Sequence, residues 1–228
     1  MRLYFIALQF LTIVPLPFGV RCDEKDLGRA MAFFPLVGLT IGLLLVGVDF
    51  VAGRLFPRPV TDLLLLATLA VVTGALHLDG LADVCDGLAA RGGRERFLAV
   101  MKDSRTGAVG VVGLVLGLLL KYEALLQVPG DMKGGALLLF PMLARYGQVQ
   151  TVVGAKSARQ DGLGASFVAS AGSFQLLTAA AVALSLSWLI LGVRGLWPFL
   201  AVSLLTGLLR SWVHRRLGGV TGDVIGCI

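Results

Sequence analysis

The sequence has few charged residues and few cysteines for its length. Among its 228 residues, charged side chains make up 15% and hydrophobic ones 57%, with a mean hydropathy of +0.87. A soluble domain usually has about a quarter of its residues charged, so this composition excludes an ordinary soluble domain. The three cysteines, Cys22, Cys85 and Cys227, lack the CxxC spacing of a zinc site and the even number of a disulfide framework. The sequence contains no clear repeat or low-complexity segment, so residues 1–228 are expected to form a single integral membrane domain.

The apolar residues occur in continuous runs rather than in alternation, which excludes a β-barrel. Six runs approach the roughly 20 residues that a helix needs to cross a bilayer, which predicts an all-α polytopic transmembrane bundle. They lie near 33–53, 59–78, 107–127, 134–155, 174–193 and 195–214. The first twenty residues contain Pro15 and Pro17 and lack a cleavage pattern, so we expect an N-terminal interfacial or half-inserted helix rather than a cleaved signal peptide. Close helix packing is predicted from small-residue spacing at Gly107, Gly110, Gly113 and Gly117.

The net charge of +6 reflects where the basic residues fall along the chain. Most of them lie at the start, between the second and third apolar runs, after the fourth run and after the sixth. The positive-inside rule therefore predicts a multi-pass protein of the cell inner membrane, with both termini and residues 77–106 in the cytoplasm. Membrane orientation accounts for most of the positive charge, so the lipid bilayer and not a nucleic acid is the expected partner. A homo-oligomer is left open.

Three aspartates, Asp79, Asp83 and Asp86, follow directly on the second apolar run. On a helix they occupy positions i, i+4 and i+7 and share one face. Carboxylates this close repel one another unless a cation neutralises them, and Mg²⁺ prefers oxygen ligands. We therefore predict a catalytic site with one or two Mg²⁺ ions, in which Asp103 supplies a fourth carboxylate. The alternative is a solvated acidic face, which the small residues around the aspartates disfavour.

Basic residues near these aspartates predict a phosphate-binding site. Lys102 and Arg105 are donors suited to phosphate, and acids for a metal beside bases for phosphate are typical of phosphoryl transfer. Arg91 is a weaker candidate, since a basic residue after a cytoplasmic helix also serves as a topology signal. Arg145 lies inside the fourth apolar run, where an unpaired charge costs about 2.5–3.5 kcal/mol on insertion scales. We therefore expect Arg145 to face a cavity and contact phosphate or an aspartate.

Two families share motifs with this chain. Residues 83-DVCDGLAAR-91 resemble the DxxDGxxAR motif of the CDP-alcohol phosphotransferases, which are membrane enzymes with a carboxylate-bound metal pair. The second half of that motif is broken, because Gly107 stands where its last aspartate belongs. A wider resemblance includes 7-ALQFLTIVPLP-17, 162-GLGASFV-168, 216-RLGGVTGD-223 and, as its most specific part, 76-LHLDGLADVCDGLAARGGRERFLAVMKDSRTGAVG-110. On these segments the chain is similar to the cobalamin synthase family, the adenosylcobinamide-GDP ribazoletransferases.

The second resemblance implies a Mg²⁺-dependent membrane transferase of late cobalamin synthesis. Such an enzyme joins α-ribazole, or its 5′-phosphate, to adenosylcobinamide-GDP and releases GMP. The substrate-contacting residues expected on this basis and from the motifs above are Gly80, Gly87, Arg91, Lys102, Ser104, Arg105, Arg145, Asp161, Thr221 and Asp223. Asp161, Thr221 and Asp223 also suit turns or caps. Family members usually continue beyond 216–223 with another apolar segment, so a chain cut short at its C-terminus is also expected.

Two other classes of protein compete with this interpretation. One is a CDP-alcohol phosphatidyltransferase-like enzyme, which the broken second half of its motif disfavours. The other is a cation-coupled transporter, in which the aspartates would bind the coupling ion. Transporter sites lie near the bilayer midplane, between repeats. Here the charges lie in a segment predicted to be cytoplasmic, and the sequence shows no two-fold repeat. The nucleotide released distinguishes the three classes. A cobalamin synthase releases GMP, a phosphatidyltransferase releases CMP, and a transporter releases no nucleotide.

Overall fold

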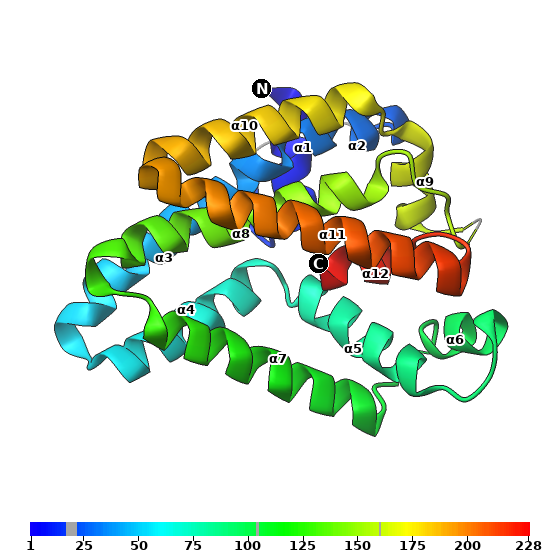
Figure 1. The fold of residues 1–228 in the computed structure, drawn as a ribbon, viewed down its shortest axis with the longest axis horizontal. Helices are drawn as coiled ribbons and strands as arrows, with labels where there is room; N and C mark the ends of the chain where they lie inside the picture. The colour runs from blue at the N-terminus through cyan, green and yellow to red at the C-terminus, as the bar shows by residue number, and fades with distance from the viewer. Residues whose placement is uncertain (17–21, 104, 160) are drawn as a thin grey trace.

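The computed structural model describes residues 1–16, 22–103, 105–159 and 161–228, and these form helices without any strand (Figure 1). The predicted all-α class is confirmed. In chain order the elements are α1 (Arg2–Leu11), α2 (Glu24–Ala30), η1 (Met31–Phe33), α3 (Phe34–Leu55), α4 (Arg58–Val72), α5 (Leu76–Ala89), α6 (Arg94–Val100), α7 (Ala108–Gln127), α8 (Gly130–Val152), α9 (Leu163–Ser170), α10 (Ser173–Leu191), η2 (Gly192–Gly195), α11 (Leu196–Leu217) and α12 (Gly222–Cys227).

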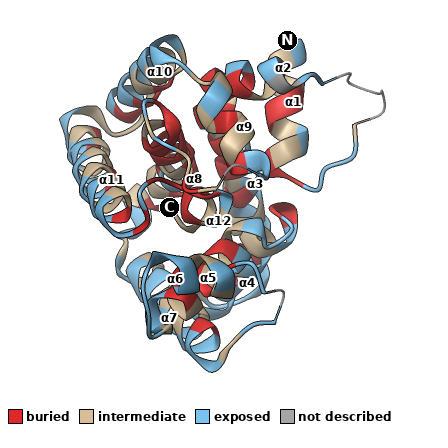
Figure 2. Cartoon of the chain, turned by 90° about the vertical axis from the view of Figure 1, so that its right-hand side faces the viewer, coloured by how far each residue is buried: buried red, intermediate tan, exposed pale blue. Residues whose placement is uncertain are grey.

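Helix α8 is the buried centre of the bundle (Figure 2). Helices α3, α10 and α11 pack around it. The closest crossing is with α3, where Gly38 and Gly42 form a GxxxG pair. A Cβ on Gly38 would overlap the carbonyl oxygen of Pro141, and one on Gly42 would lie 2.8 Å from the carbonyl oxygen of Leu137. The two backbones therefore touch, as small residues at this spacing allow in a membrane.

This crossing gives a prediction with an internal control. Gly38→Ala is expected to lower the free energy of unfolding by about 1–3 kcal/mol, because the added methyl group forces α3 away from α8. Gly47→Ala, on the same helix with nothing within 4 Å of the added Cβ, is expected to be neutral or slightly stabilising. Thermal unfolding of both variants in detergent measures the difference. Equal melting temperatures would show that the crossing is not tight.

A second layer of the bundle consists of α4, α5 and α7. Helices α4 and α5 meet at an angle of 89°, at a break where Gly74 and Ala75 adopt left-handed backbone conformations. Helix α7 packs against both of them. A Cβ on Gly113 would overlap the Cys85 thiol, and one on Gly117 would lie 2.9 Å from the Leu81 side chain. The packing role predicted for the glycines at the start of α7 is therefore confirmed.

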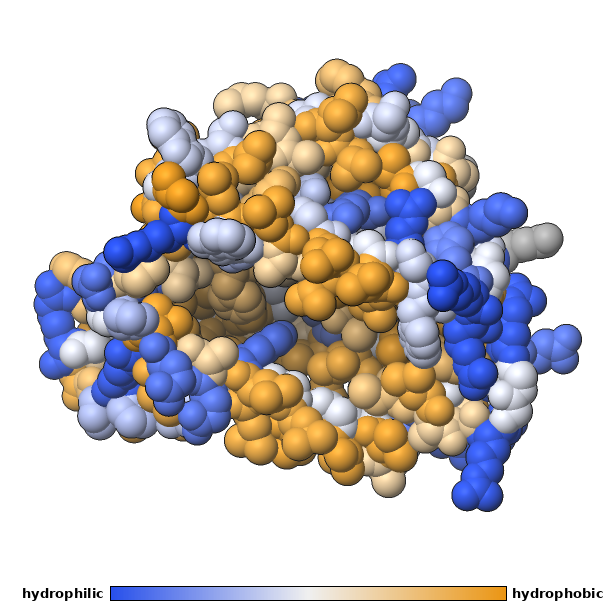
Figure 3. Space-filling model, viewed as in Figure 1, coloured by the Kyte–Doolittle hydropathy of each residue, from blue (hydrophilic) through white to orange (hydrophobic). Residues whose placement is uncertain are grey.

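Three helical runs among the described residues are long and apolar enough to cross a membrane, and the bent pair of α4 and α5 makes a fourth candidate. The runs are Lys25–Leu55, Ala108–Gln127 and Ser173–Leu217. The last contains α10 and α11, which lie side by side in Figure 1 and contact each other. Figure 3 shows apolar side chains across the middle of one face, with hydrophilic groups toward both edges. The chain is thus an all-α membrane bundle. The expectation of six crossings stays a prediction, because α8 is long enough to cross a membrane but is not among the helices apolar enough to count as candidate spans.

Helix α1 occupies the place of the predicted N-terminal half-inserted helix. Its 10 residues are too few to span a bilayer, and its buried residues Ile6, Ala7 and Leu11 pack into the core. Arg2 forms an ion pair with Asp26 of α2, which holds the two short helices together. Whether α1 lies at the membrane interface stays a prediction.

The polar segments gather at one end of the bundle, on the right in Figure 1. They are α6 with residues 101–103 after it, residues 153–159 and residues 218–223. Residues 156–158 and Val220 are joined by two backbone hydrogen bonds, from Ala158 N to Val220 O (2.9 Å) and from Val220 N to Lys156 O (2.8 Å). This pairing brings the segment after α8 to the start of α12, beside α5. The candidate residues from distant parts of the sequence therefore meet at one end of the fold.

Candidate active site

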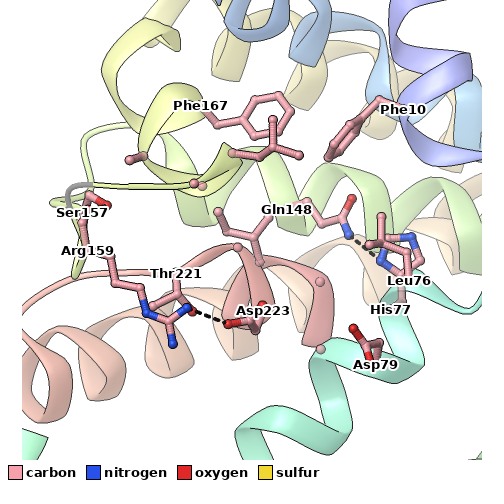
Figure 4. A pocket seen from close by; sticks show the side chains of 18 of the residues that line it. Phe10, Leu76, His77, Asp79, Gln148, Ser157, Arg159, Phe167, Thr221 and Asp223 are labelled. Carbon is pink, nitrogen blue, oxygen red and sulfur yellow. Dashed lines mark hydrogen bonds and ion pairs between the residues drawn. The ribbon is translucent and has the colours of Figure 1, made fainter. Parts of the chain in front are cut away.

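A cavity of about 270 Å³ lies at the polar end, between α5, α9 and α12 (Figure 4). One wall is polar and includes Asp79 and His77 of α5, Gln148 of α8, Arg159 and Asp223. The opposite wall is apolar and contains three phenylalanines from α1, α3 and α9. The cavity therefore presents carboxylates and a guanidinium on one side and aromatic rings on the other.

Three carboxylates, Asp79, Asp83 and Asp223, form what we call the carboxylate cluster. Asp79 and Asp83 are one turn apart on α5. Gly80 brings Asp223 to them, because it lets α12 pack so closely that a Cβ on Gly80 would lie 2.6 Å from the Asp223 carbonyl oxygen. The negative charges of Asp79, Asp223 and Asp86 all act on the Asp83 carboxyl. The predicted sharing of one face by the α5 aspartates is confirmed, and α12 adds a carboxylate to that face.

Asp223 is the best-partnered member of the cluster. It follows the N-cap of α12, where Thr221 Oγ1 accepts a hydrogen bond from Val224 N at 3.3 Å. Burial raises the pKa of Asp223. The positive charge of Arg159 lowers this pKa, and the negative charge of Asp79 raises it further. The Nη1 atom of Arg159 lies 3.4 Å from Asp223 Oδ2, and Nη2 donates to the carbonyl oxygen of Leu98 at 2.9 Å. Arg159 is therefore a fixed cation at the edge of the cluster.

Asp86 is held by the start of α7. Its Oδ2 accepts a hydrogen bond from Gly107 N and its Oδ1 one from Gly110 N, each at 2.7 Å. A Cβ on either glycine would overlap the carboxylate. A carboxylate in this position satisfies free N–H groups of a helix N-terminus and is stabilised by the helix dipole. Asp86 thus fixes α7 against α5, and its additional role as a metal ligand stays a prediction.

The loop after α6 lies at the rim of the site. Asp103 accepts two hydrogen bonds from the Arg105 side chain, at 3.0 and 2.7 Å, which lower the pKa of Asp103 to about 2. Lys102 pairs with Asp161 at 3.1 Å, and both side chains are mostly exposed. Asp161 lines the cavity, whereas Asp103 does not. The predicted four-carboxylate group is therefore divided, with Asp103 neutralised by its own neighbour.

The other predicted contact residues lie in different surroundings. Arg91 is exposed after the end of α5, and Ser104 falls outside the described residues. The space beside Gly87 is filled by the chain itself, since a Cβ there would lie 2.6 Å from the Phe97 ring. Arg145 is buried in α8 and lines a second, mostly apolar cavity of about 680 Å³, where it is joined by Lys121. Arg145 therefore faces a cavity as expected, but not the one that the carboxylate cluster borders.

Sequence reasoning missed three features of the site. Arg159 belongs to the basic residues after the fourth apolar run, which indicate only membrane orientation, yet it forms an ion pair with Asp223 of the cluster. Gln148 stands in an apolar run, which was a visible signal, and its Nε2 lies 3.2 Å from Nδ1 of His77. The three phenylalanines of the apolar wall, Phe10, Phe34 and Phe167, could not be predicted as a group, because they come from three helices that only the fold brings together.

The donor atoms of the carboxylate cluster fit a hard divalent cation, whose ligands are oxygens. Among the described residues, the ion pair of Arg159 with Asp223, at 3.4 Å, offsets part of the repulsion among the cluster charges. Within the described part of the chain, no three His, Cys, Asp or Glu side chains already converge closely enough to hold a metal ion. The oxygen donors of the cluster are thus of the kind that Mg²⁺ prefers, but among the described residues they do not converge on one point, and a bound Mg²⁺ stays a prediction.

The fold is that of a helical membrane protein with an acidic cavity at one end of the bundle. A family model described as Cobalamin-5-phosphate synthase matches residues 3–228, and the chain belongs to that family. It is accordingly a transferase of cobalamin biosynthesis, as the resemblance in the sequence implied. The matches support neither a CDP-alcohol phosphotransferase nor a transporter.

Relatives named adenosylcobinamide-GDP ribazoletransferase match nearly the whole chain. The one from Geotalea daltonii is 65% identical over 228 residues, which are 100% of this chain and 92% of the relative. Those from Acetivibrio thermocellus and Pseudomonas aeruginosa are 36% and 39% identical; they align with 98% and 100% of this chain and with 90% and 93% of their own lengths. No solved structure matches the chain.

Proposed function

We propose that the protein joins α-ribazole, or its 5′-phosphate, to adenosylcobinamide-GDP at the first cavity and releases GMP. The observation that carries this proposal is a cavity lined by Asp79, Asp223 and Arg159 on one side and by three phenylalanine rings on the other, with Asp83 one helical turn from Asp79 on α5. Carboxylates for a metal beside a guanidinium for phosphate are the equipment of phosphoryl transfer. The names of the full-length relatives support this substrate.

The proposed reaction is a displacement at phosphorus. A ribose hydroxyl of the ribazole forms a new P–O bond to the phosphorus on the cobinamide side of the pyrophosphate. The bond from this phosphorus to the bridging oxygen breaks, and GMP leaves with that oxygen. The hydroxyl proton passes to a carboxylate that lines the cavity, Asp79 or Asp223. The products are adenosylcobalamin, or its 5′-phosphate, and GMP.

The residues of the chain position the reactants and stabilise charge. Arg159 is held by Leu98 and Asp223 and can donate to the departing phosphate, where negative charge develops. Lys102 and Arg105 lie at the exposed rim, where they would attract the pyrophosphate as it approaches. Asp79, Asp83 and Asp223 would hold Mg²⁺, with Asp86 keeping α5 and α7 in register. When bound, Mg²⁺ would neutralise charge on the pyrophosphate.

We also propose that the protein lies in the inner membrane of the cell and that its cavity opens to the cytoplasm. The clustering of basic residues on the polar end of the bundle supports this orientation. The site then receives soluble nucleotides, while the apolar helices remain in lipid.

Release of GMP by the purified protein in lipid nanodiscs tests the proposal. With adenosylcobinamide-GDP, α-ribazole and Mg²⁺, we expect GMP and the joined corrinoid in equal amounts. Omitting α-ribazole or adding EDTA is expected to abolish both products, and excess Mg²⁺ should restore them. Release of CMP from CDP-alcohols, or no nucleotide release by a protein that melts cooperatively, would contradict the proposal.

A further inference from the structure

The apolar wall of the first cavity is built from three phenylalanine rings, Phe10 of α1, Phe34 of α3 and Phe167 of α9. Ring centroids lie 4.9 Å apart for Phe10 and Phe167, 6.0 Å for Phe34 and Phe167, and 6.2 Å for Phe10 and Phe34. Phe34 and Phe167 are buried, whereas Phe10 is half-buried at the cavity. We call these three rings the aromatic wall; two of them, Phe10 and Phe167, lie edge to face and are seen above the polar residues in Figure 4.

The polar side of the same cavity has unused hydrogen-bonding atoms. Gln148 is 2% exposed and donates toward Nδ1 of His77, yet its Oε1 has no hydrogen-bond partner within the described residues. The Nε2 atom of His77 is likewise buried without a partner among those residues. A buried polar atom without a partner costs about 1–3 kcal/mol, so these atoms indicate a place where a ligand hydroxyl group completes the hydrogen bonding.

The size of the cavity limits what it can enclose. Pockets that bury small ligands typically have volumes of about 300–1000 Å³, and this one, at about 270 Å³, lies just below that range. A corrinoid macrocycle is far too large for it, whereas one aromatic ring system with a sugar is not.

We infer that the aromatic wall is the subsite for the base of an aromatic nucleoside, whose ribose lies against Gln148 and His77. The assignment rests on the proposed function, in which that nucleoside is α-ribazole with its benzimidazole base. In this orientation the ribose hydroxyls lie on the polar side, where Asp79 and Asp223 line the cavity. The nucleophile is thus placed by stacking of its base rather than by contacts to the reacting atoms.

The chemistry of the wall favours this base over guanine, the base of the departing nucleotide. Guanine has several hydrogen-bonding groups on its edge, and these would be buried against phenylalanine rings without partners. A methylated benzimidazole has an almost wholly apolar edge, so it loses little when water is excluded.

Replacing wall residues tests the assignment directly. Phe10→Leu and Phe167→Leu are each expected to weaken binding of α-ribazole about tenfold, because stacking of a base on an aromatic side chain is lost. In turnover, the KM for α-ribazole should rise by the same factor, while the KM for adenosylcobinamide-GDP stays unchanged. Phe174→Leu, at a side chain of α10 that is 72% exposed, is the matched control and should leave both values as in the wild type. Phe10→Tyr keeps a ring at the wall and should retain binding.

Direct binding, measured by calorimetry with α-ribazole alone, separates this inference from the proposed function. If the wild type binds α-ribazole and the wall variants do not, the subsite stands even where no GMP is released. Wild-type affinity in both leucine variants would overturn the subsite, whatever the activity. Displacement of bound α-ribazole by GMP with equal affinity would also overturn it, since the wall would then not distinguish the two bases. Phe10→Leu alters a half-buried ring, so it provides the answer if Phe167→Leu fails to fold.

Discussion

Asp83→Asn is expected to lower turnover roughly 100- to 1000-fold, the range observed when one electrostatic group is removed from a preorganised site. Asp83 lies one helical turn from Asp79 on α5, and the charges of Asp79, Asp223 and Asp86 all act on its carboxyl. Asparagine preserves the shape of the side chain but removes the charge that a divalent cation requires. The expected loss is therefore in kcat, with little change in the melting temperature.

Asp223→Asn is expected to have an effect of the same order, because the cluster acts as a unit. Asp131→Asn is the matched control, since Asp131 is an exposed aspartate in the first turn of α8, away from the cavity. The measurement is GMP release at saturating substrate and a series of Mg²⁺ concentrations. Turnover of Asp83→Asn within a few-fold of that of Asp131→Asn would remove the carboxylate cluster from the reaction.

The second large effect concerns stability at the other end of the bundle. Lys133 of α8 contacts Oδ1 of Asp49 and Oδ1 of Asp62, each at 2.6 Å, and thereby ties together α3, α4 and α8. Asp62 is fully buried, with Arg58 Nε at 3.5 Å from its second oxygen. Lys133→Met is expected to destabilise the fold by about 3–5 kcal/mol, because it leaves a buried carboxylate without its main counter-charge.

Two further variants identify the cause of that loss. Adding Asp62→Asn to Lys133→Met is expected to recover part of the melting temperature, since the unpaired buried charge is then gone. Lys25→Met, at an exposed lysine of α2, should have almost no effect. A melting temperature for Lys133→Met equal to that of Lys25→Met would show that the buried network contributes nothing to stability.

The helices were predictable from the sequence because apolar runs of membrane length leave the backbone few alternatives. The break between α4 and α5 was not predictable from the sequence. Residues 59–78 form one continuous apolar run, yet α4 ends at Val72 and the chain turns by 89° before α5 begins. The left-handed conformations of Gly74 and Ala75 produce this turn, and the alanine gives no sign of it in the sequence. Asp79 therefore belongs to the first turn of a separate helix rather than to the end of a span.

The α5 aspartates were predictable because a shared helix face depends only on local spacing. The other residues of the cavity were not predictable, because Arg159, Gln148 and the aromatic wall come to the cavity only through tertiary packing. Asp86 illustrates a different limit: its spacing fits the metal face, but its oxygens accept hydrogen bonds from Gly107 and Gly110. The spacing of residues on a helix predicts which face a carboxylate occupies, whereas its hydrogen-bond partners depend on the tertiary structure.

The fate of the oxygen atom of the attacking hydroxyl tests the central claim most directly. The protein would be supplied with adenosylcobinamide-GDP and α-ribazole labelled with ¹⁸O in its ribose hydroxyls, and the products would be analysed by mass spectrometry. The account predicts that all of the label stays in the joined corrinoid, with unlabelled GMP formed in equal amount. Label in a ribazole–guanosine dinucleotide, formed together with cobinamide phosphate, would contradict it and indicate attack at the other phosphorus. GMP formed without a joined corrinoid would also contradict it and indicate simple hydrolysis.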